Sequence, residues 1–192
     1  MRFPTLTALL CTLPFLPAFG HSACALETEY VDSTFAEKQF RCEVVALLDA
    51  PASAVEAVLR DYEQYPSLDA RILEARVLER PTQNTATLET TLRACFGPFC
   101  RKVRRVEEVA ESPLGLAAIT DPSRSDIRFG ETHTSIEAVG DSQTRITYRT
   151  SIVPGFWVPA LGGRRWMLKT LEDATLTLFE NVESRAQSRG GV

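Results

Sequence analysis

The chain has 192 residues, with 21 Lys and Arg against 25 Asp and Glu, and a formal net charge of −4 at pH 7. This mildly acidic balance argues against nucleic acid as the main partner, because binding phosphates requires a basic surface. The length and the absence of linkers or low-complexity tracts suit one soluble domain with a substantial core.

The N-terminus has the parts of a cleavable secretory signal. Arg2 is the only charge before Glu27, an apolar stretch follows it, and Ala23-Cys24-Ala25 supplies the small residues at the end. We therefore expect residues 1–25 to be a signal peptide and residues 26–192 to be one mature domain, located in the periplasm or outside the cell. Loss of Arg2 changes the charge from −4 to −5.

Two alternatives to a cleaved signal remain. A membrane anchor would need a longer uninterrupted apolar run, and Pro14 and Pro17 break this one. A lipoprotein acylated at Cys24 is less well supported, because His21 stands where such signals prefer Leu or a similar residue. No second apolar run approaches transmembrane length, so we expect no stable membrane span.

The first predicted elements of the mature chain are a strand and a helix. Residues 40–48 alternate at first and then become fully apolar, which indicates a strand buried on at least one face. Asp49 is a candidate N-cap, and Pro51 fits the first turn of a helix that should end near Asp61. Tyr65-Pro66 then marks a break.

A run of strands is predicted next. Residues 85–96 alternate most clearly, whereas residues 101–109 do not, which predicts a bulge or a wrongly assigned segment there. A hairpin around Gly140-Asp141-Ser142 joins the last two strands. The predicted strands are residues 72–79, 85–96, 101–109, 115–120, 126–139 and 144–153.

A long helix is predicted at the end, over about residues 164–185. Its residues recur at three- and four-residue steps, which places them on one face. This stripe is Leu168, Leu171, Thr175, Leu178 and Val182. A strand, a helix, many antiparallel strands and one long helix together predict an α+β fold with the helices on one side of a sheet.

Two stretches carry a resemblance to a known family. Residues 48–66 combine an apolar strand end, a short helix and an Asp-Tyr…Tyr-Pro stop, and Pro154-Gly155-Phe156-Trp157-Val158-Pro159 leads into the last helix. Together with the order of elements over about residues 35–187, they resemble the START-like or SRPBCC superfamily, which includes polyketide cyclases and coenzyme Q-binding START proteins. The resemblance implies the helix-grip fold, in which a curved antiparallel sheet wraps around a long C-terminal helix, with short helices after the first strand.

The resemblance also implies a cavity between the sheet and the last helix, which in relatives commonly holds a lipid, isoprenoid, quinone or polyketide. We expect an exported binding protein for an apolar small molecule or lipid, with no cofactor and no metal. One fold hosts many functions, so a cyclase- or dehydrase-type enzyme and an interaction module with a filled core remain alternatives. No residue matches a fixed catalytic set, which favours a binding protein over an enzyme.

The candidate ligand contacts come from the last helix, its approach and the last strand. Thr175 is small and polar within an apolar row, so it is the position expected to border empty or ligand-filled space. Trp157 and Trp166 would either frame the cavity mouth or pack ordinarily at the helix start. The residues expected to contact the ligand are Leu168, Leu171, Thr175, Leu178, Tyr148, Trp157 and Trp166.

Polar side chains that could serve an enzyme are few: His133, Tyr148 and Glu89 are the visible candidates. His133 shares a strand face with Glu131 and lacks neighbours at metal-ligand spacing, so an ordinary side-chain partner is the simpler interpretation. Glu89 is expected to face outward, because Leu88 lies on the opposite, apolar face.

A basic run follows the expected hairpin tip. It consists of Arg101, Lys102, Arg104 and Arg105. Such a run on a strand is typical of a solvated edge, with at most a transient contact to a membrane.

Three cysteines remain after the signal. Cys95 and Cys100 flank Phe96-Gly97-Pro98-Phe99, which is typical of a hairpin tip and brings the two thiols close enough for a disulfide. Cys42 is then left over, either buried and inert or paired with Cys24 if cleavage falls earlier.

Overall fold

The computed structural model describes residues 26–96, 99–159 and 161–190, so the predicted signal peptide lies outside the described residues. These described residues form eight strands, two short α-helices and a 3-10 helix before a final long helix. In chain order these are β1 (Glu27–Ala36), β2 (Gln39–Leu48), α1 (Ala52–Leu59), η1 (Tyr62–Gln64), α2 (Tyr65–Leu68), β3 (Ile72–Thr82), β4 (Thr85–Phe96), β5 (Phe99–Ser112), β6 (Gly115–Thr120), β7 (Ile127–Val139), β8 (Gln143–Pro154) and α3 (Gly163–Gly190).

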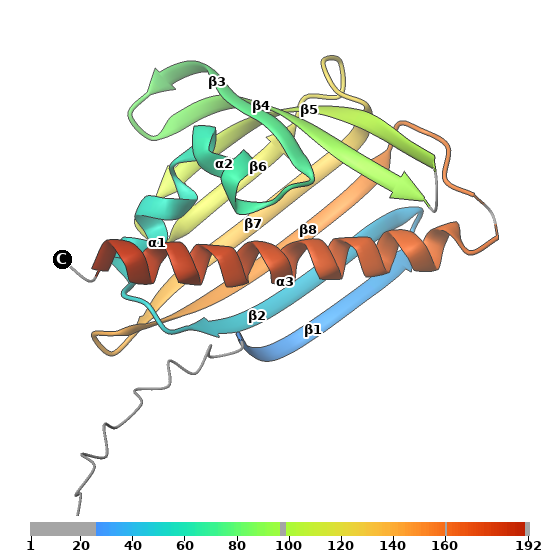
Figure 1. Ribbon diagram of the computed structural model, residues 1–192. Helices are drawn as coiled ribbons and strands as arrows, with labels where there is room; N and C mark the ends of the chain where they lie inside the picture. Colours follow the sequence, from blue (N-terminus) through green and yellow to red (C-terminus); the bar gives the residue numbers. More distant parts are fainter. Residues whose placement is uncertain (1–25, 97–98, 160, 191–192) are drawn as a thin grey trace, which may run out of the picture.

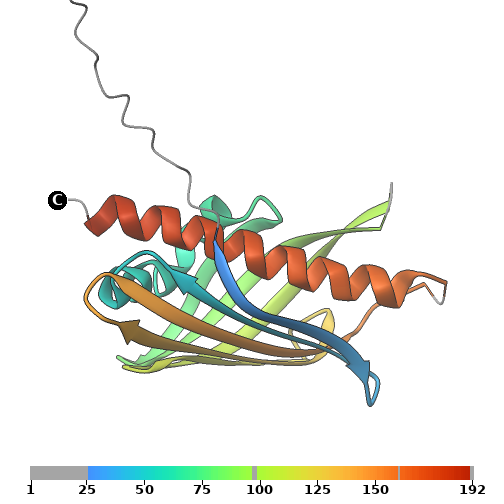
Figure 2. The same cartoon turned by 90° about the horizontal axis from the view of Figure 1, so that it is seen from below.

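All eight strands belong to one antiparallel sheet with the order β1-β2-β8-β7-β6-β5-β4-β3. The sheet curves around α3, which runs along its concave side (Figures 1 and 2). The short segment from α1 to α2 carries the chain from β2 to β3 at the far edge of the sheet (Figure 1). The predicted α+β architecture, a curved sheet around a long C-terminal helix, is confirmed.

The core lies under the C-terminal half of α3. The inward side chains of β2 are all buried, from Phe40 through Val44 to Leu48, because this central strand alternates strictly. From Cys42 to Leu48 they pack with α1 and with Phe179 and Val182 of α3 in one continuous apolar cluster. This half of the helix is therefore held mainly against the apolar core, although Leu178 and Phe179 also line a pocket.

The N-terminal region differs from its prediction in two respects. Strand β1 was not predicted, because its residues are almost all exposed and show no apolar alternation. The assignment of Asp49 as an N-cap was wrong: Pro51 is the N-cap of α1, without a side-chain capping bond. The backbone N–H of Asp49 instead donates to the Glu183 carboxylate of α3, at 2.6 Å.

Strand β5 is continuous, so the bulge predicted in residues 101–109 is wrong. Its register with β4 is unbroken from Phe96↔Phe99 to Thr85↔Ala110. The alternation is hidden because Arg105 and Glu107 face inward, in line with the buried Val103 and Val109. Val106 faces outward but is buried, since the loop after β6 covers it: Ser125 Oγ accepts from its backbone N–H at 2.8 Å.

The predicted disulfide is confirmed, because Cys95 and Cys100 are bonded across the β4–β5 tip. Cys42 is buried on β2 and forms no disulfide within the described residues. Burial raises the pKa of its thiol to about 11, so the thiol is protonated at neutral pH and is a poor nucleophile. Over the described ranges, no helix is long and apolar enough to cross a membrane.

Candidate ligand-binding cavity

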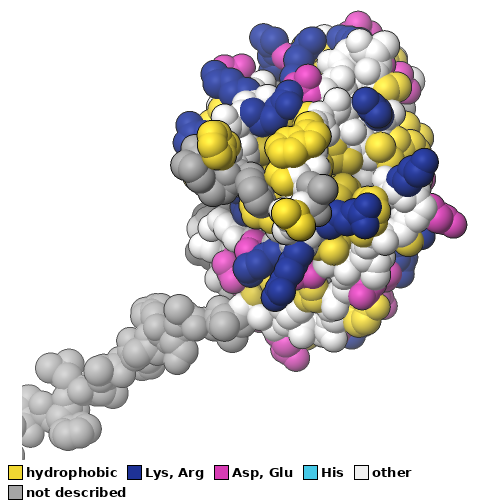
Figure 3. All heavy atoms as spheres, turned by 90° about the vertical axis from the view of Figure 1, so that its right-hand side faces the viewer, with side chains coloured by type: hydrophobic (Ala, Val, Ile, Leu, Met, Phe, Trp, Pro, Cys, Tyr) yellow, Lys and Arg dark blue, Asp and Glu magenta, His cyan; other side chains and the backbone are white. Residues whose placement is uncertain are grey.

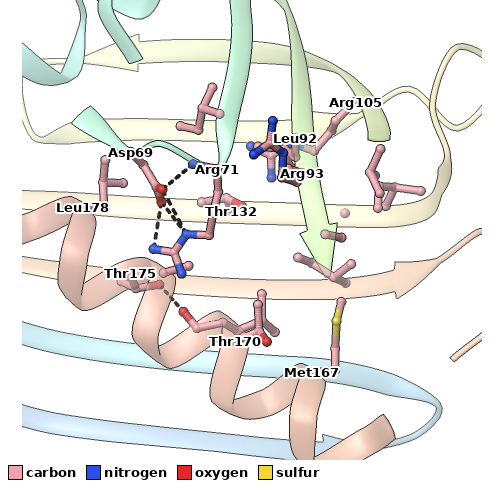
Figure 4. Close-up of a pocket in the computed structure, with 18 of the residues that line it drawn as sticks. Asp69, Arg71, Leu92, Arg93, Arg105, Thr132, Met167, Thr170, Thr175 and Leu178 are labelled. Carbon is pink, nitrogen blue, oxygen red and sulfur yellow. Dashed lines mark hydrogen bonds and ion pairs between the residues drawn. The ribbon is translucent and has the colours of Figure 1, made fainter. Parts of the chain in front are cut away.

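Two adjoining lobes of a cavity lie between the sheet and α3. The outer lobe, about 190 Å³, borders the N-terminal half of α3, and the inner lobe, about 120 Å³, reaches toward α1 and η1. Side chains from β3, β4, β5, β7, β8 and α3 line both lobes where they join. Figure 4 shows the outer lobe, with Leu92, Arg105, Thr132 and Leu178 labelled. The residues that line both lobes are Ile72, Leu92, Arg105, Glu107, Thr132, Tyr148 and Leu178.

The outer lobe has mainly apolar walls. Val103, Ile127 and Ile152 form a small buried cluster on the sheet side, with Leu171 of α3 packed against it. Met167 adds a flexible thioether to the helix side. Such walls favour an apolar ligand through burial of its surface.

The inner lobe is lined by aromatic and aliphatic side chains from η1, α2 and the sheet. The hydroxyl of Tyr62 donates to Glu111 at 2.8 Å, and that of Tyr65 donates to the Leu59 carbonyl at 2.7 Å. Burial raises the pKa of both phenols, so they are protonated at neutral pH. Their hydroxyls are already engaged with the protein, which leaves their rings as apolar wall.

The junction of the lobes carries an ion pair. Arg105 Nη2 and Glu107 Oε2 are 3.0 Å apart, and Thr120 Oγ1 donates to Glu107 Oε1 at 3.4 Å. Glu107 is only 3% exposed. A charged pair this deep in an apolar cavity offers both a donor and an acceptor to a ligand.

Sequence reasoning missed this pair. The basic run was interpreted as a solvated edge; Arg101 and Lys102 are exposed, but Arg104 is paired with Glu89 and Arg105 lines both lobes. The signal that could have found it is parity along the strand: Arg105 and Glu107 stand two and four residues after Val103, so they share its inward face.

Tyr148 is the acid–base candidate that lies inside the cavity. It faces inward from β8, and its ring meets that of Phe179 edge-on, with centroids 6.1 Å apart. Burial raises its pKa, opposed by the charge of Arg105 and by hydrogen bonding to Thr150 and Thr132. It is therefore protonated at neutral pH and can donate a hydrogen bond.

The predicted contacts fall into two groups. Leu171, Thr175, Leu178, Tyr148 and Trp166 line the outer lobe. Leu168 and Trp157 do not line either lobe.

The positions of Leu168 and Trp157 have physical causes. Leu168 lies one turn before Glu172, whose carboxylate accepts a hydrogen bond from Ser33, so this side of α3 faces β1 rather than the cavity. Trp157 is 80% exposed on the connection between β8 and α3, where ordinary core packing is ruled out.

His133 and Glu89 both lie on the outer face of the sheet. His133 Nε2 and Glu131 Oε1 are 2.8 Å apart on an exposed stretch of β7. Glu89 accepts hydrogen bonds from Nε of Arg76 at 2.8 Å and from Nε of Arg104 at 2.6 Å. These bonds lower the pKa of its carboxyl group, so it is a charged structural group remote from the cavity.

One side of the outer lobe is bordered by an ion pair that also reaches α3. Arg71 Nη2 and Asp69 Oδ2 are 2.9 Å apart, and the same nitrogen donates to the Asp173 carbonyl at 3.4 Å (Figure 4). Arg71 therefore links the start of β3 to the helix. The side chains of Asp69 and Arg71 at this rim therefore bond to each other and to α3.

The other end of the outer lobe opens toward a shallow apolar groove of about 250 Å³, between the β4–β5 tip and the start of α3. Ala94, Phe156 and Trp166 line both the lobe and the groove. Figure 3 looks onto this end and shows hydrophobic side chains with Lys and Arg side chains around them. Trp157 and Phe99 are the exposed aromatic side chains of the groove.

The described residues contain no group of three or more His, Cys, Asp or Glu placed to hold a metal ion. Inside the cavity, the chemical groups are the apolar walls, the Arg105–Glu107 pair and the hydroxyl groups around that pair.

No protein-family model and no curated protein sequence matches the chain. Solved structures do match its fold. Zhui aromatase/cyclase from a Streptomyces species is 14% identical, with a TM-score of 0.62 over 79% of this chain and 95% of that one. A START superfamily protein from Mycobacterium smegmatis is 17% identical, with a TM-score of 0.61 over 77% and 97%.

A STAR-related lipid transfer protein from Xanthomonas axonopodis is 13% identical, with a TM-score of 0.61 over 82% of this chain and 98% of that one. Identities this low carry a likeness of fold only. The sheet order, the long helix in its concave side and these matches agree: the chain has the START-like helix-grip fold.

Proposed function

We propose that this protein is an exported binding protein that holds an apolar small molecule or lipid between its sheet and α3. The observation that carries the proposal is the two-lobed cavity with mainly apolar walls, about 190 Å³ and 120 Å³ in its two parts. An apolar cavity of about 150 Å³ is enough to bind benzene in other proteins, so each lobe is on the scale of a ring or a short chain.

The structural neighbours support this choice of ligand class. Their names include a STAR-related lipid transfer protein and an aromatase/cyclase, and a lipid is a largely apolar molecule. The alternative of an interaction module with a filled core fits less well, because a filled core would leave no space at Thr175, which lines the outer lobe. Export rests on the N-terminal sequence pattern.

An enzyme is the second candidate, and one observation favours it. Arg105, Glu107 and Tyr148 bring charge and a hydroxyl group into the same apolar cavity, as acid–base chemistry on a bound polyketide-like molecule would require. A carrier retains its ligand unchanged, whereas an enzyme turns it over. Recovery of a converted product after incubation with the captured ligand, lost in a Glu107→Gln variant, would favour the enzyme.

Mass spectrometry of the protein isolated from its own cellular compartment tests both parts of the proposal. Under denaturing conditions the mass should correspond to a chain that begins near Leu26. Under native conditions an additional mass should remain bound, and organic extraction should release it as an apolar compound. A full-length chain or a chain acylated at Cys24 would contradict the soluble exported form, and a ligand-free protein that binds no hydrophobic probe would contradict the binding function.

A further inference from the structure

The two lobes and the exposed groove follow one another along β5 and α3. Arg101 of β5 lines the groove, Val103 lines the outer lobe and Val109 lines the inner lobe. At about 3.4 Å per strand residue, the distance from Arg101 to Val109 is about 27 Å. On α3 the lining extends from Trp166 to Leu178, about 18 Å at about 1.5 Å per residue. Lobes of about 190 and 120 Å³ spread over such a length are narrow, which suits a linear chain better than a fused ring system.

The two ends of this path differ in their access to solvent. The inner lobe is bounded by Leu59 and Tyr62, which are 5% and 2% exposed, and the Tyr62 hydroxyl is bonded to Glu111. The groove is bounded by the exposed aromatic side chains Phe99 and Trp157. A chain-shaped ligand would therefore enter from the groove and leave one end there.

Positive charge without a matching acid gathers around the groove (Figure 3). Five exposed basic side chains come from β4, β5 and the start of α3, and none forms an ion pair with another described residue: Arg93, Arg101, Lys102, Arg164 and Arg165. The guanidinium of Arg101 lies 4.7 Å from the centre of the Phe156 ring, which lines both the outer lobe and the groove. Its charge is therefore held at the opening of the cavity.

The interior has no such excess of charge. Asp69 and Glu107 are the acidic side chains that line the lobes, and each is paired with an arginine. Among its described lining residues the groove has no acidic side chain. An anionic group is therefore attracted to the groove end of the path, and an apolar chain to the lobes.

We propose that the ligand is a single-chain amphiphile with a negatively charged head group, bound with its tail in the lobes and its head at the groove. This inference rests on the proposed binding function and names the chemical class of its ligand. Arg101 and Arg93 are the cations expected nearest the head group, because Arg101 lines the groove and Arg93 lines the outer lobe.

Three probes with the same chain and different head groups test the charge preference: dodecanoate, dodecanol and dodecylammonium. At pH 7 they are negative, neutral and positive. We expect the mature protein to bind dodecanoate about tenfold more tightly than dodecylammonium, because the basic groove attracts one head group and repels the other. Added salt should reduce this difference, since the groove is open to solvent. Displacement of a hydrophobic fluorescent probe, with each compound kept monomeric, gives the affinities.

Variants at the groove test the position of the head group. Arg101→Gln should weaken dodecanoate binding several-fold and leave dodecanol binding unchanged, and adding Arg93→Gln should weaken it further. Arg101→Lys keeps the charge and should keep most of the affinity. Arg185→Gln is the matched control: this half-buried arginine lies in the last turns of α3 and also forms no ion pair among the described residues, so its loss should change none of the three affinities.

Chain length tests the position of the tail. From octanoate to dodecanoate, affinity should rise about threefold to fourfold for each added CH₂ group that becomes buried. Ala118 is half-buried and lines the inner lobe. Ala118→Leu should therefore shorten the chain length at which this gain stops, without changing octanoate binding. Thermal melting confirms that each variant is folded.

The outcomes distinguish this inference from the function on which it rests. Equal affinities for the three head groups, or tighter binding of dodecylammonium, would overturn the anionic head group and leave a binding protein for apolar chains. An undiminished preference for dodecanoate in the Arg93 and Arg101 double variant would overturn the placement of the head at the groove. A chain-length dependence unaltered by Ala118→Leu would overturn the placement of the tail. Failure to bind any of these compounds, or any larger apolar probe, would count against the proposed function itself.

Discussion

Single charged residues take opposite roles on the two faces of this sheet. On the outer face Glu89 is held between Arg76 and Arg104, whose side chains remain partly exposed to solvent. On the inner face Arg105 and Glu107 pair inside the cavity, with no comparable access to water. The outer cluster links the neighbouring strands β3, β4 and β5, whereas the inner pair gives an otherwise apolar cavity a polar centre.

The outer cluster predicts a pH-dependent contribution to stability. Arg76 and Arg104 lower the pKa of the Glu89 carboxyl group below its ordinary 4.5. A carboxyl with a lowered folded-state pKa stabilises the fold above the unfolded value and loses that contribution as pH falls through the folded one. Glu89→Gln should therefore lower the free energy of unfolding by about 1 kcal/mol at pH 7, because the arginines are partly solvated.

The difference between Glu89→Gln and the unmodified protein should shrink as the pH drops below about 4.5, where the carboxyl of the unfolded chain protonates first, and should be lost once the pH falls below the lower folded-state pKa. Denaturant unfolding at several pH values measures it. Glu79→Gln, an exposed change on β3, is the control and should leave stability unaltered. A constant difference from pH 7 to pH 3 would contradict the ion-pair account.

The predictions for single residues succeeded where they used the alternation of side chains along a strand. They failed where residues were grouped by charge alone. Glu89 was placed outward by its alternation with Leu88, and the structure agrees. Arg105 was grouped with its basic neighbours, although its parity with Val103 places it inside. The pairing of Thr90 on β4 with Arg105 on β5 depends on the register between strands, which the pattern of one strand does not contain.

At the scale of elements, the two halves of α3 have different surroundings. Its C-terminal half packs Phe179, Val182 and Ala186 into the main core, while Met167, Leu171 and Thr175 border the outer lobe. The helix and the strand pattern were predictable because both periodicities are strong in the sequence. Strand β1 was not, because an edge strand exposed to solvent carries no apolar period, and only pairing with β2 defines it.

Thr175→Trp tests whether this half of α3 borders usable space. Thr175 is 5% exposed, its hydroxyl donates to the Leu171 carbonyl at 2.9 Å, and its side chain lines the outer lobe. An indole there should occupy the lobe and abolish binding of a hydrophobic fluorescent probe, with a near-normal melting temperature. In a filled core the same substitution would cost about 1–3 kcal/mol or more through overpacking.

Thr177→Trp is the matched control on the same helix. Its hydroxyl likewise donates four residues back, to the Asp173 carbonyl at 2.7 Å, but the side chain lies outside both lobes. This variant should keep both probe binding and stability. Strong destabilisation by Thr175→Trp with unchanged probe binding would contradict the placement of the ligand beside α3.

At the scale of the whole molecule, the opening of the outer lobe and the exposed apolar groove share one end. Phe99, Trp157 and Leu161 are 78%, 80% and 91% exposed there. Exposed basic side chains flank the same segments, in contrast to the net negative charge of the chain. They are Arg101, Lys102, Arg164 and Arg165.

Aromatic side chains beside Lys and Arg are typical of surfaces that insert into the headgroup region of an anionic bilayer. Transient contact of this end with a membrane would bring the outer lobe to the source of an apolar ligand. The rest of the molecule, with its acidic balance, would be repelled from the same surface, which favours one orientation.

Vesicle co-sedimentation tests this orientation through Trp157→Ser. We expect the mature protein to bind phosphatidylglycerol vesicles weakly and phosphatidylcholine vesicles less, because the contact combines burial of an aromatic side chain with attraction of basic residues to anionic lipid. Trp157→Ser should reduce binding several-fold, and added salt should reduce what remains. Leu114→Ser is the control: Leu114 is 77% exposed but lies beyond the opposite end of β5, so its loss should have no effect. Equal losses from the two variants would mean that exposed apolar area alone, and not this end of the cavity, meets the membrane.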